Sequence, residues 1–103
     1  MRVPEAAPET RHVYHVYSVM HPRRDALQQS LAAAGVQTGI HYPIPVHLLE
    51  AHADLGYGAG DLPVTEQIAR EELSLPMFAE LSDAQIDETR AVVLRVAEPI
   101  VTV

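Results

Sequence analysis

The segment "GIHYPIPVH", residues 39–47, brings together side chains that could hold a ligand. His41 and Tyr42 supply an imidazole and a phenol, which can hydrogen-bond phosphate or sugar oxygens. Pro43 and Pro45 fix φ at about −65° and keep the segment extended, so little entropy would be lost on binding. A polar turn tied back onto its own domain is an equally good interpretation of these residues.

The histidines also raise the possibility of a metal site, since the chain has six of them. His41, His47 and His52 are six and five residues apart, and neutral imidazole is a good zinc ligand. This spacing does not place two ligands on one helix face, and the chain has no cysteine to support them. We therefore expect no metal site, and a small His-rich metal-binding protein is the weakest alternative.

Acidic pairs and serines do not form a catalytic centre by their spacing. Glu71 and Glu72 are neighbours on a predicted helix and are interpreted as solvated helix charges. No serine lies in a nucleophile-elbow sequence. All seven basic residues are arginine, so this chain alone cannot carry out a reaction that needs an active-site lysine. We predict no catalytic residue in the chain.

Composition narrows the class of protein and its partners. A chain of 103 residues that is 48% hydrophobic can bury one modest core. The formal charge of −7 and the scattered arginines argue against nucleic acid as a partner. No apolar run approaches the roughly 20 residues that span a bilayer, and the absence of cysteine fits a reducing compartment. We expect a cytoplasmic protein that binds neither membrane nor nucleic acid.

The elements that must position the loop alternate along the chain. Strands are expected at residues 12–20 and 36–40, a short extended segment at 73–77, and helices at 23–35, 46–56, 64–73 and 83–98. The pattern predicts an α/β fold, a two-layer sandwich in which helices pack on a small sheet of about three strands. One domain, residues 12–98, should follow a flexible lead-in at 1–11 and precede a short tail at 99–103.

The predicted helices carry their own start, stop and core signals. Leu27 and Leu31 should face the core from the first helix, and Val64, Ile68 and Leu73 from the helix at 64–73.

The last helix, residues 83–98, is the clearest of these predictions. Ser82 and Gln85 should form a capping box at its start, and Pro99 should stop it. Its apolar stripe is predicted to comprise Ile86, Val93, Leu94 and Ala97.

Two longer stretches carry a family resemblance. "GIHYPIPVHLLEAHADLGY" followed by "LPVTEQIAREELSLPMFAELSDAQID" resembles the C-terminal part of the DegT/StrS-type sugar aminotransferases, over about residues 11–97. The resemblance implies a fold-type I enzyme of amino sugar biosynthesis, dependent on pyridoxal phosphate. A large N-terminal domain would hold the cofactor and its Schiff-base lysine, and a small α/β domain would complete the cleft. This chain is similar only to the small domain.

The resemblance therefore implies a fragment that is inactive alone and binds no cofactor covalently. The whole enzyme, a homodimer, would transfer an amino group from glutamate to a keto-sugar nucleotide. His41, Tyr42 and His47 match residues expected on the nucleotide-sugar side of the cleft. Residues 75–77 match a packing segment, and Gly39 would let its strand approach the large domain. A non-catalytic binding or dimerisation domain derived from this family is the alternative.

Overall fold

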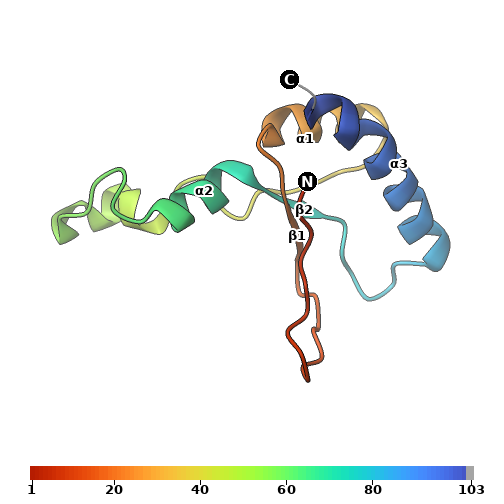
Figure 1. Cartoon of the computed structure of the whole chain (residues 1–103), viewed down its shortest axis with the longest axis horizontal. Helices are drawn as coiled ribbons and strands as arrows, with labels where there is room; N and C mark the ends of the chain where they lie inside the picture. Colours follow the sequence, from red (N-terminus) through yellow and green to blue (C-terminus); the bar gives the residue numbers. More distant parts are fainter. Residues whose placement is uncertain (102–103) are drawn as a thin grey trace.

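The computed structural model describes the backbone of residues 1–101 and the side chains of residues 1–97. Its elements are β1 (Tyr17–Met20), α1 (Arg24–Ala33), η1 (Val46–Leu48), η2 (Glu50–Leu55), α2 (Pro63–Glu71), β2 (Glu72–Leu75) and α3 (Asp83–Val101). Helices α1 and α3 pack together beside the sheet, and η1, η2 and α2 form an arm that projects away from them (Figure 1). The α/β prediction is confirmed.

Strand β2 lies at the centre of the small sheet. It pairs antiparallel with β1, which places Ser18 opposite Ser74. On its other side, Gly39 and Ser74 exchange two backbone hydrogen bonds, of 3.0 Å and 2.7 Å. Arg2 and Met20 form a similar bridge on the outer edge of β1. Residues 40–45, called the site loop from here on, therefore leave the sheet directly beside β2.

The predicted sheet of about three strands is one strand too many, since the sheet of the described residues has two. Residues 36–40 pair only through Gly39. Pairing cannot continue far beyond them, because Pro43 and Pro45 lack the N–H groups that a ladder needs. Residues 12–16 are not strand either, since Tyr14 has a φ of 49° and interrupts the extended backbone.

Two predicted helix ends also differ from the structure. Helix α2 ends at Glu71, because Glu72 takes up extended backbone and begins β2. Helix α3 continues past Pro99 to Val101, so the prediction that Pro99 stops this helix is wrong. Residues 102 and 103 of the predicted tail lie outside the described residues. The domain boundaries at residues 11 and 98 stay a prediction.

The start of α3 follows the sequence prediction. The backbone N–H of Ser82 donates to Oε1 of Gln85 at 3.0 Å, and the Gln85 N–H donates to Oγ of Ser82 at 3.2 Å. These reciprocal bonds form a capping box that satisfies two groups at the helix end. The capping prediction is confirmed.

The core lies between α1, α3 and the sheet. Leu27 and Leu31 are fully buried as predicted, and they pack with Val19, Val36, Leu73, Val92, Val93 and Ala97. The apolar stripe of α3 is only partly buried, because Ile86 and Leu94 face an open groove of about 390 Å³ beside the N-terminal segment. Of the stripe that the helical pattern predicted, only Val93 and Ala97 are therefore buried in the core.

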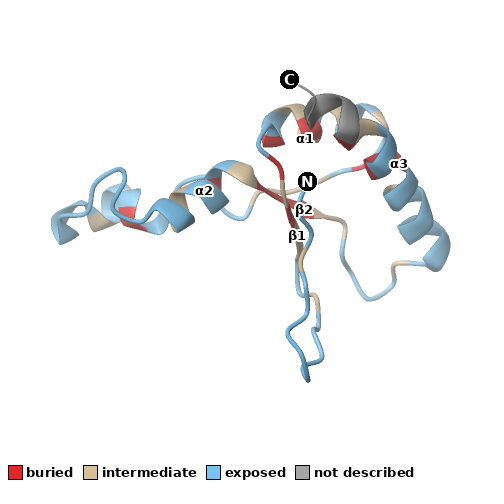
Figure 2. Ribbon diagram, viewed as in Figure 1, coloured by how far each residue is buried: buried red, intermediate tan, exposed pale blue. Residues whose placement is uncertain are grey.

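Most residues of the arm are exposed or half-buried (Figure 2), and several of the exposed ones are large and apolar. Val64 is 68% exposed and Ile68 is 43% exposed, so the prediction that they face inward is wrong. Leu73, the third residue of that predicted face, is buried from β2 instead. Other large apolar residues exposed on the arm and its approach are Tyr42, Ile44, Val46, Leu55 and Tyr57.

None of the helices in the described part of the chain combines the length and the apolar character needed to cross a bilayer.

We predict that Leu31→Ala lowers the free energy of unfolding by about 2–5 kcal/mol, because it leaves a cavity in the fully buried core. The matched control, Leu94→Ala, removes a side chain that is 59% exposed and should change the value by about 0.5 kcal/mol or less. Urea denaturation of the three proteins measures both effects. Equal losses in the two variants would contradict this description of the core.

Candidate functional site

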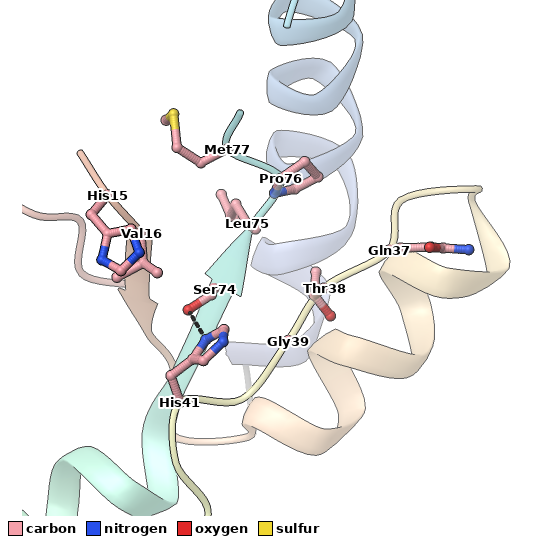
Figure 3. Close-up of a pocket in the computed structure, with 10 residues that line it drawn as sticks. All are labelled: His15, Val16, Gln37, Thr38, Gly39, His41, Ser74, Leu75, Pro76 and Met77. Carbon is pink, nitrogen blue, oxygen red and sulfur yellow. Dashed lines mark hydrogen bonds between the residues drawn. The ribbon is translucent and has the colours of Figure 1, made fainter. Parts of the chain in front are cut away.

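The site loop begins directly after Gly39, which is bridged to Ser74 of β2. A Cβ atom at Gly39 would lie 3.2 Å from Cε1 of His41, closer than side chains normally approach. Glycine at this position therefore leaves room for the His41 ring to fold back toward the sheet. The ring reaches Ser74, with Nδ1 of His41 lying 2.8 Å from Oγ of Ser74 (Figure 3).

The buried carboxylate of Glu72 holds the start of this loop. Glu72 is 2% exposed, and its Oε2 accepts the backbone N–H of His41 at 2.7 Å. Its Oε1 accepts the hydroxyl of Ser18 at 3.0 Å and the hydroxyl of Ser74. Three donors from two strands and the loop thus converge on one carboxylate. The prediction that Glu72 is a solvated helix charge is wrong, because α2 has ended and β2 turns this side chain inward.

His41 and Ser74 line an open pocket of about 250 Å³ (Figure 3). His15, Gln37 and Thr38 also line this pocket, with the Gln37 side chain pointing away from His41 (Figure 3), whereas Leu75, Pro76 and Met77 supply its apolar part. The segment at 75–77, interpreted from the sequence as packing, therefore also forms a wall of this pocket. The combination of apolar and hydrogen-bonding groups suits a small polar ligand.

Tyr42 lies outside this pocket and faces solvent. Its side chain is 75% exposed, and its ring stands edge-on to His41 with the centroids 5.6 Å apart. The peptide bond between the two residues is cis. The structure thus places His41 and Tyr42 side by side, with one ring held by the sheet and the other available to a partner.

His47 is in a different environment from His41. It is 5% exposed on η1, and its Nε2 lies 3.2 Å from Oε2 of Glu66 on α2. Tyr57 stands edge-on to its ring. His47 therefore connects the loop to α2 within the arm, and the structure does not bring it into the pocket with His41.

Glu66 accepts hydrogen bonds from the turn that precedes α2. Its carboxylate accepts the N–H of Gly60 at 2.8 Å and 3.1 Å and the N–H of Leu62 at 3.2 Å. The hydrogen bond from Gly60 lowers the pKa of Glu66 below its usual 4.5, and the bonds from Leu62 and His47 act in the same direction.

The histidines do not gather around one point. His41 contacts Ser74, His47 contacts Glu66, and Nδ1 of His52 lies 2.9 Å from the carbonyl oxygen of Val46. Within the described residues, no three potential ligands are close enough to hold a metal ion. The metal-binding alternative therefore has no support in the arrangement of these side chains.

Glu72, Ser74 and Ser18 are site residues that sequence reasoning missed. The signal was available in part, because residues two apart on a strand point to the same face, and "ELS" places Glu72 and Ser74 in that relation. Because Glu72 was expected to lie in the preceding helix, this shared orientation was not predicted.

Comparison with known proteins identifies the family. Residues 1–94 match the model of the DegT/DnrJ/EryC1/StrS aminotransferase family. The chain belongs to this family. The sequence resemblance is thereby confirmed.

Relatives of this DegT-family chain are longer than it is. It is 46% identical over 89 residues to the erythromycin biosynthesis sensory transduction protein EryC1 of Saccharopolyspora erythraea, which covers 86% of the chain and 24% of EryC1. It is 43% identical over 83 residues to the dTDP-3-amino-3,4,6-trideoxy-alpha-D-glucose transaminase of Streptomyces venezuelae, covering 81% of the chain and 22% of the relative.

A solved structure gives the same result. DesV of S. venezuelae, crystallised in complex with a ketimine intermediate, superposes with a TM-score of 0.89 at 40% identity. The match covers 94% of this chain and 26% of DesV. The DegT-family chain thus spans about a quarter of the length of these relatives.

We predict that the Gly60 amide reports the titration of Glu66 with a midpoint below pH 4.5. The unfolded chain binds this proton at higher pH than the folded chain, so the stability that Glu66 contributes is present above pH 4.5 and is lost as the pH falls through its folded pKa. The measurement is the Gly60 amide chemical shift against pH. Glu66→Gln should abolish the step, and a wild-type midpoint at or above 4.5 would contradict the hydrogen bonds described.

Proposed function

We propose that this chain is the small C-terminal domain of a nucleotide-sugar aminotransferase that depends on pyridoxal phosphate. The whole enzyme would transfer an amino group from glutamate to a keto-sugar nucleotide. His41 and Tyr42 would contact the nucleotide sugar. The relatives support the substrate class, since several of them are named as transaminases of sugar nucleotides.

The observation that carries the proposal is the His41–Tyr42 loop held against β2 at the edge of an open pocket. Its backbone is fixed by Glu72 at 2.7 Å and its imidazole by Ser74 at 2.8 Å. Groups held in place before a ligand arrives lose little entropy when it binds. These contacts tie the loop back onto its own domain, and the open pocket that His41 lines is what supports a ligand-binding role for it.

The residues of this chain do not fit the covalent anchor of the cofactor. Enzymes of this class bind pyridoxal phosphate through the amine of a lysine, and none of the 103 residues is lysine. The role proposed for this chain is therefore to bind and orient the substrate. When it is bound elsewhere in the whole enzyme, the cofactor would supply the electron sink for amino transfer.

His47 takes a supporting role in this proposal. It is buried against Glu66, which favours a residue that shapes the arm over one that touches the ligand. His47 would thus act on the site by holding the segment that follows Tyr42.

A non-catalytic binding or dimerisation domain is the second candidate. The observation that favours it is the row of exposed apolar side chains on the arm, where Val64 is 68% and Leu55 is 60% exposed. Such a surface suits a protein partner. In the first candidate, the remainder of a homodimeric enzyme would cover this surface.

We predict that replacing His41 by Ala and Tyr42 by Phe raises the KM for the nucleotide sugar roughly 10- to 100-fold, the expected effect of losing hydrogen bonds to a charged or hydroxylated ligand. The test uses a chimera in which residues 1–94 replace the matching segment of the S. venezuelae transaminase. Cofactor absorbance should be unchanged.

The control for this experiment is His12→Ala, which changes an exposed histidine that does not line the pocket. It should leave KM unchanged. A double variant with unaltered KM would contradict the proposed substrate contacts. A chimera that binds the cofactor but transfers no amino group would favour the second candidate.

A further inference from the structure

The hydroxyl of Ser74 contacts two polar groups but has only one proton to donate. Its Oγ contacts Oε1 of Glu72 and lies 2.8 Å from Nδ1 of His41. Ser74 is 5% exposed, so water has little access to its hydroxyl group. The direction of the two hydrogen bonds therefore determines which nitrogen of His41 carries its proton.

The carboxylate fixes that direction. An ionised Glu72 can only accept hydrogen bonds, and it already accepts the N–H of His41 at 2.7 Å and the hydroxyl of Ser18 at 3.0 Å. Its contact with Ser74 needs the serine proton, because two oxygens without a proton between them repel each other. The proton in the bond between Ser74 and His41 must then come from Nδ1 of the imidazole.

We propose that Glu72 and Ser74 are positioning residues that hold neutral His41 as its Nδ1–H tautomer. A neutral imidazole carries one N–H, so Nε2 is left as a hydrogen-bond acceptor. His41 lines the pocket with Nε2 as its remaining polar atom. Such a site takes a hydroxyl donor, as on a sugar ring, in preference to a phosphate oxygen, which only accepts.

This inference deepens the proposed function and rests on it for the identity of the ligand. From composition, His41 could bind either phosphate or sugar oxygens. The orientation of the relay favours the sugar hydroxyl. The tautomer itself is a property of the unliganded chain, so it can be measured without substrate.

The test is 15N NMR of the imidazole rings in the 103-residue chain. It is made at about pH 8, above the usual pKa of histidine of about 6.5, so that the neutral form is observed. We expect a pyrrole-type signal at Nδ1 of His41 and a pyridine-type signal at Nε2, with this tautomer in about tenfold excess. Ser74→Ala removes the acceptor and should give a mixture of tautomers. The matched control, Ser18→Ala, also removes a hydroxyl bonded to Glu72 but does not touch His41, and should keep the wild-type signals.

A second variant, Glu72→Gln, tests the tautomer independently if Ser74→Ala does not fold. In Glu72→Gln the amide can donate to Ser74, which would turn the serine proton toward Nδ1 and favour the Nε2–H tautomer of His41. A wild-type ring with its proton on Nε2 would overturn the inference, as would a Glu72→Gln spectrum identical to wild type. Neither result depends on the KM measurement, so failure of the relay and failure of the proposed substrate contact are distinguishable.

Discussion

The buried carboxylate of Glu72 is the interaction on which the candidate site depends. It joins β1 through Ser18, its own strand through Ser74 and the site loop through the amide of His41. A buried polar group left without a partner costs about 1–3 kcal/mol. The carboxylate and its three donors therefore satisfy one another, and these hydrogen bonds fix the loop to the sheet. The two prolines after Tyr42 then limit how far the backbone can depart from that position.

A second buried charge joins the arm to the core. Arg24, at the start of α1 and 9% exposed, donates through Nη1 to the carbonyl oxygens of Ala69 and Glu72, each at 3.0 Å. These carbonyls lie where α2 ends and β2 begins, so the guanidinium satisfies acceptors that the helix end leaves open. The same junction positions Glu72 and orients the arm. The hydrogen bonds of Arg24 thus contact both the helix of the arm, through Ala69, and the strand that carries the site, through Glu72.

Local signals in the sequence were sufficient where one element decides its own structure. The capping box of Ser82 and Gln85 and the core face of Leu27 and Leu31 could be predicted from spacing alone. The role of Glu72 could not, because it depends on α2 ending at Glu71, two residues earlier than predicted, and on a serine 54 residues away. The exposure of Val64 could not be predicted either, since helical spacing marks an apolar face without showing what covers it. The motif "GIHYP" identified the site loop, but the contacts that hold it are non-local.

The most direct test of this account is amide hydrogen exchange at His41 and Gly39 in the wild-type chain and in Glu72→Met. Methionine has about the length of glutamate but carries neither carboxylate oxygen, so it removes the acceptor of the His41 amide. The account predicts that exchange at the His41 amide becomes about tenfold faster or more. The Gly39 amide, which donates to the backbone of Ser74, should stay protected. Equal protection of the His41 amide in both proteins would contradict a loop held by Glu72.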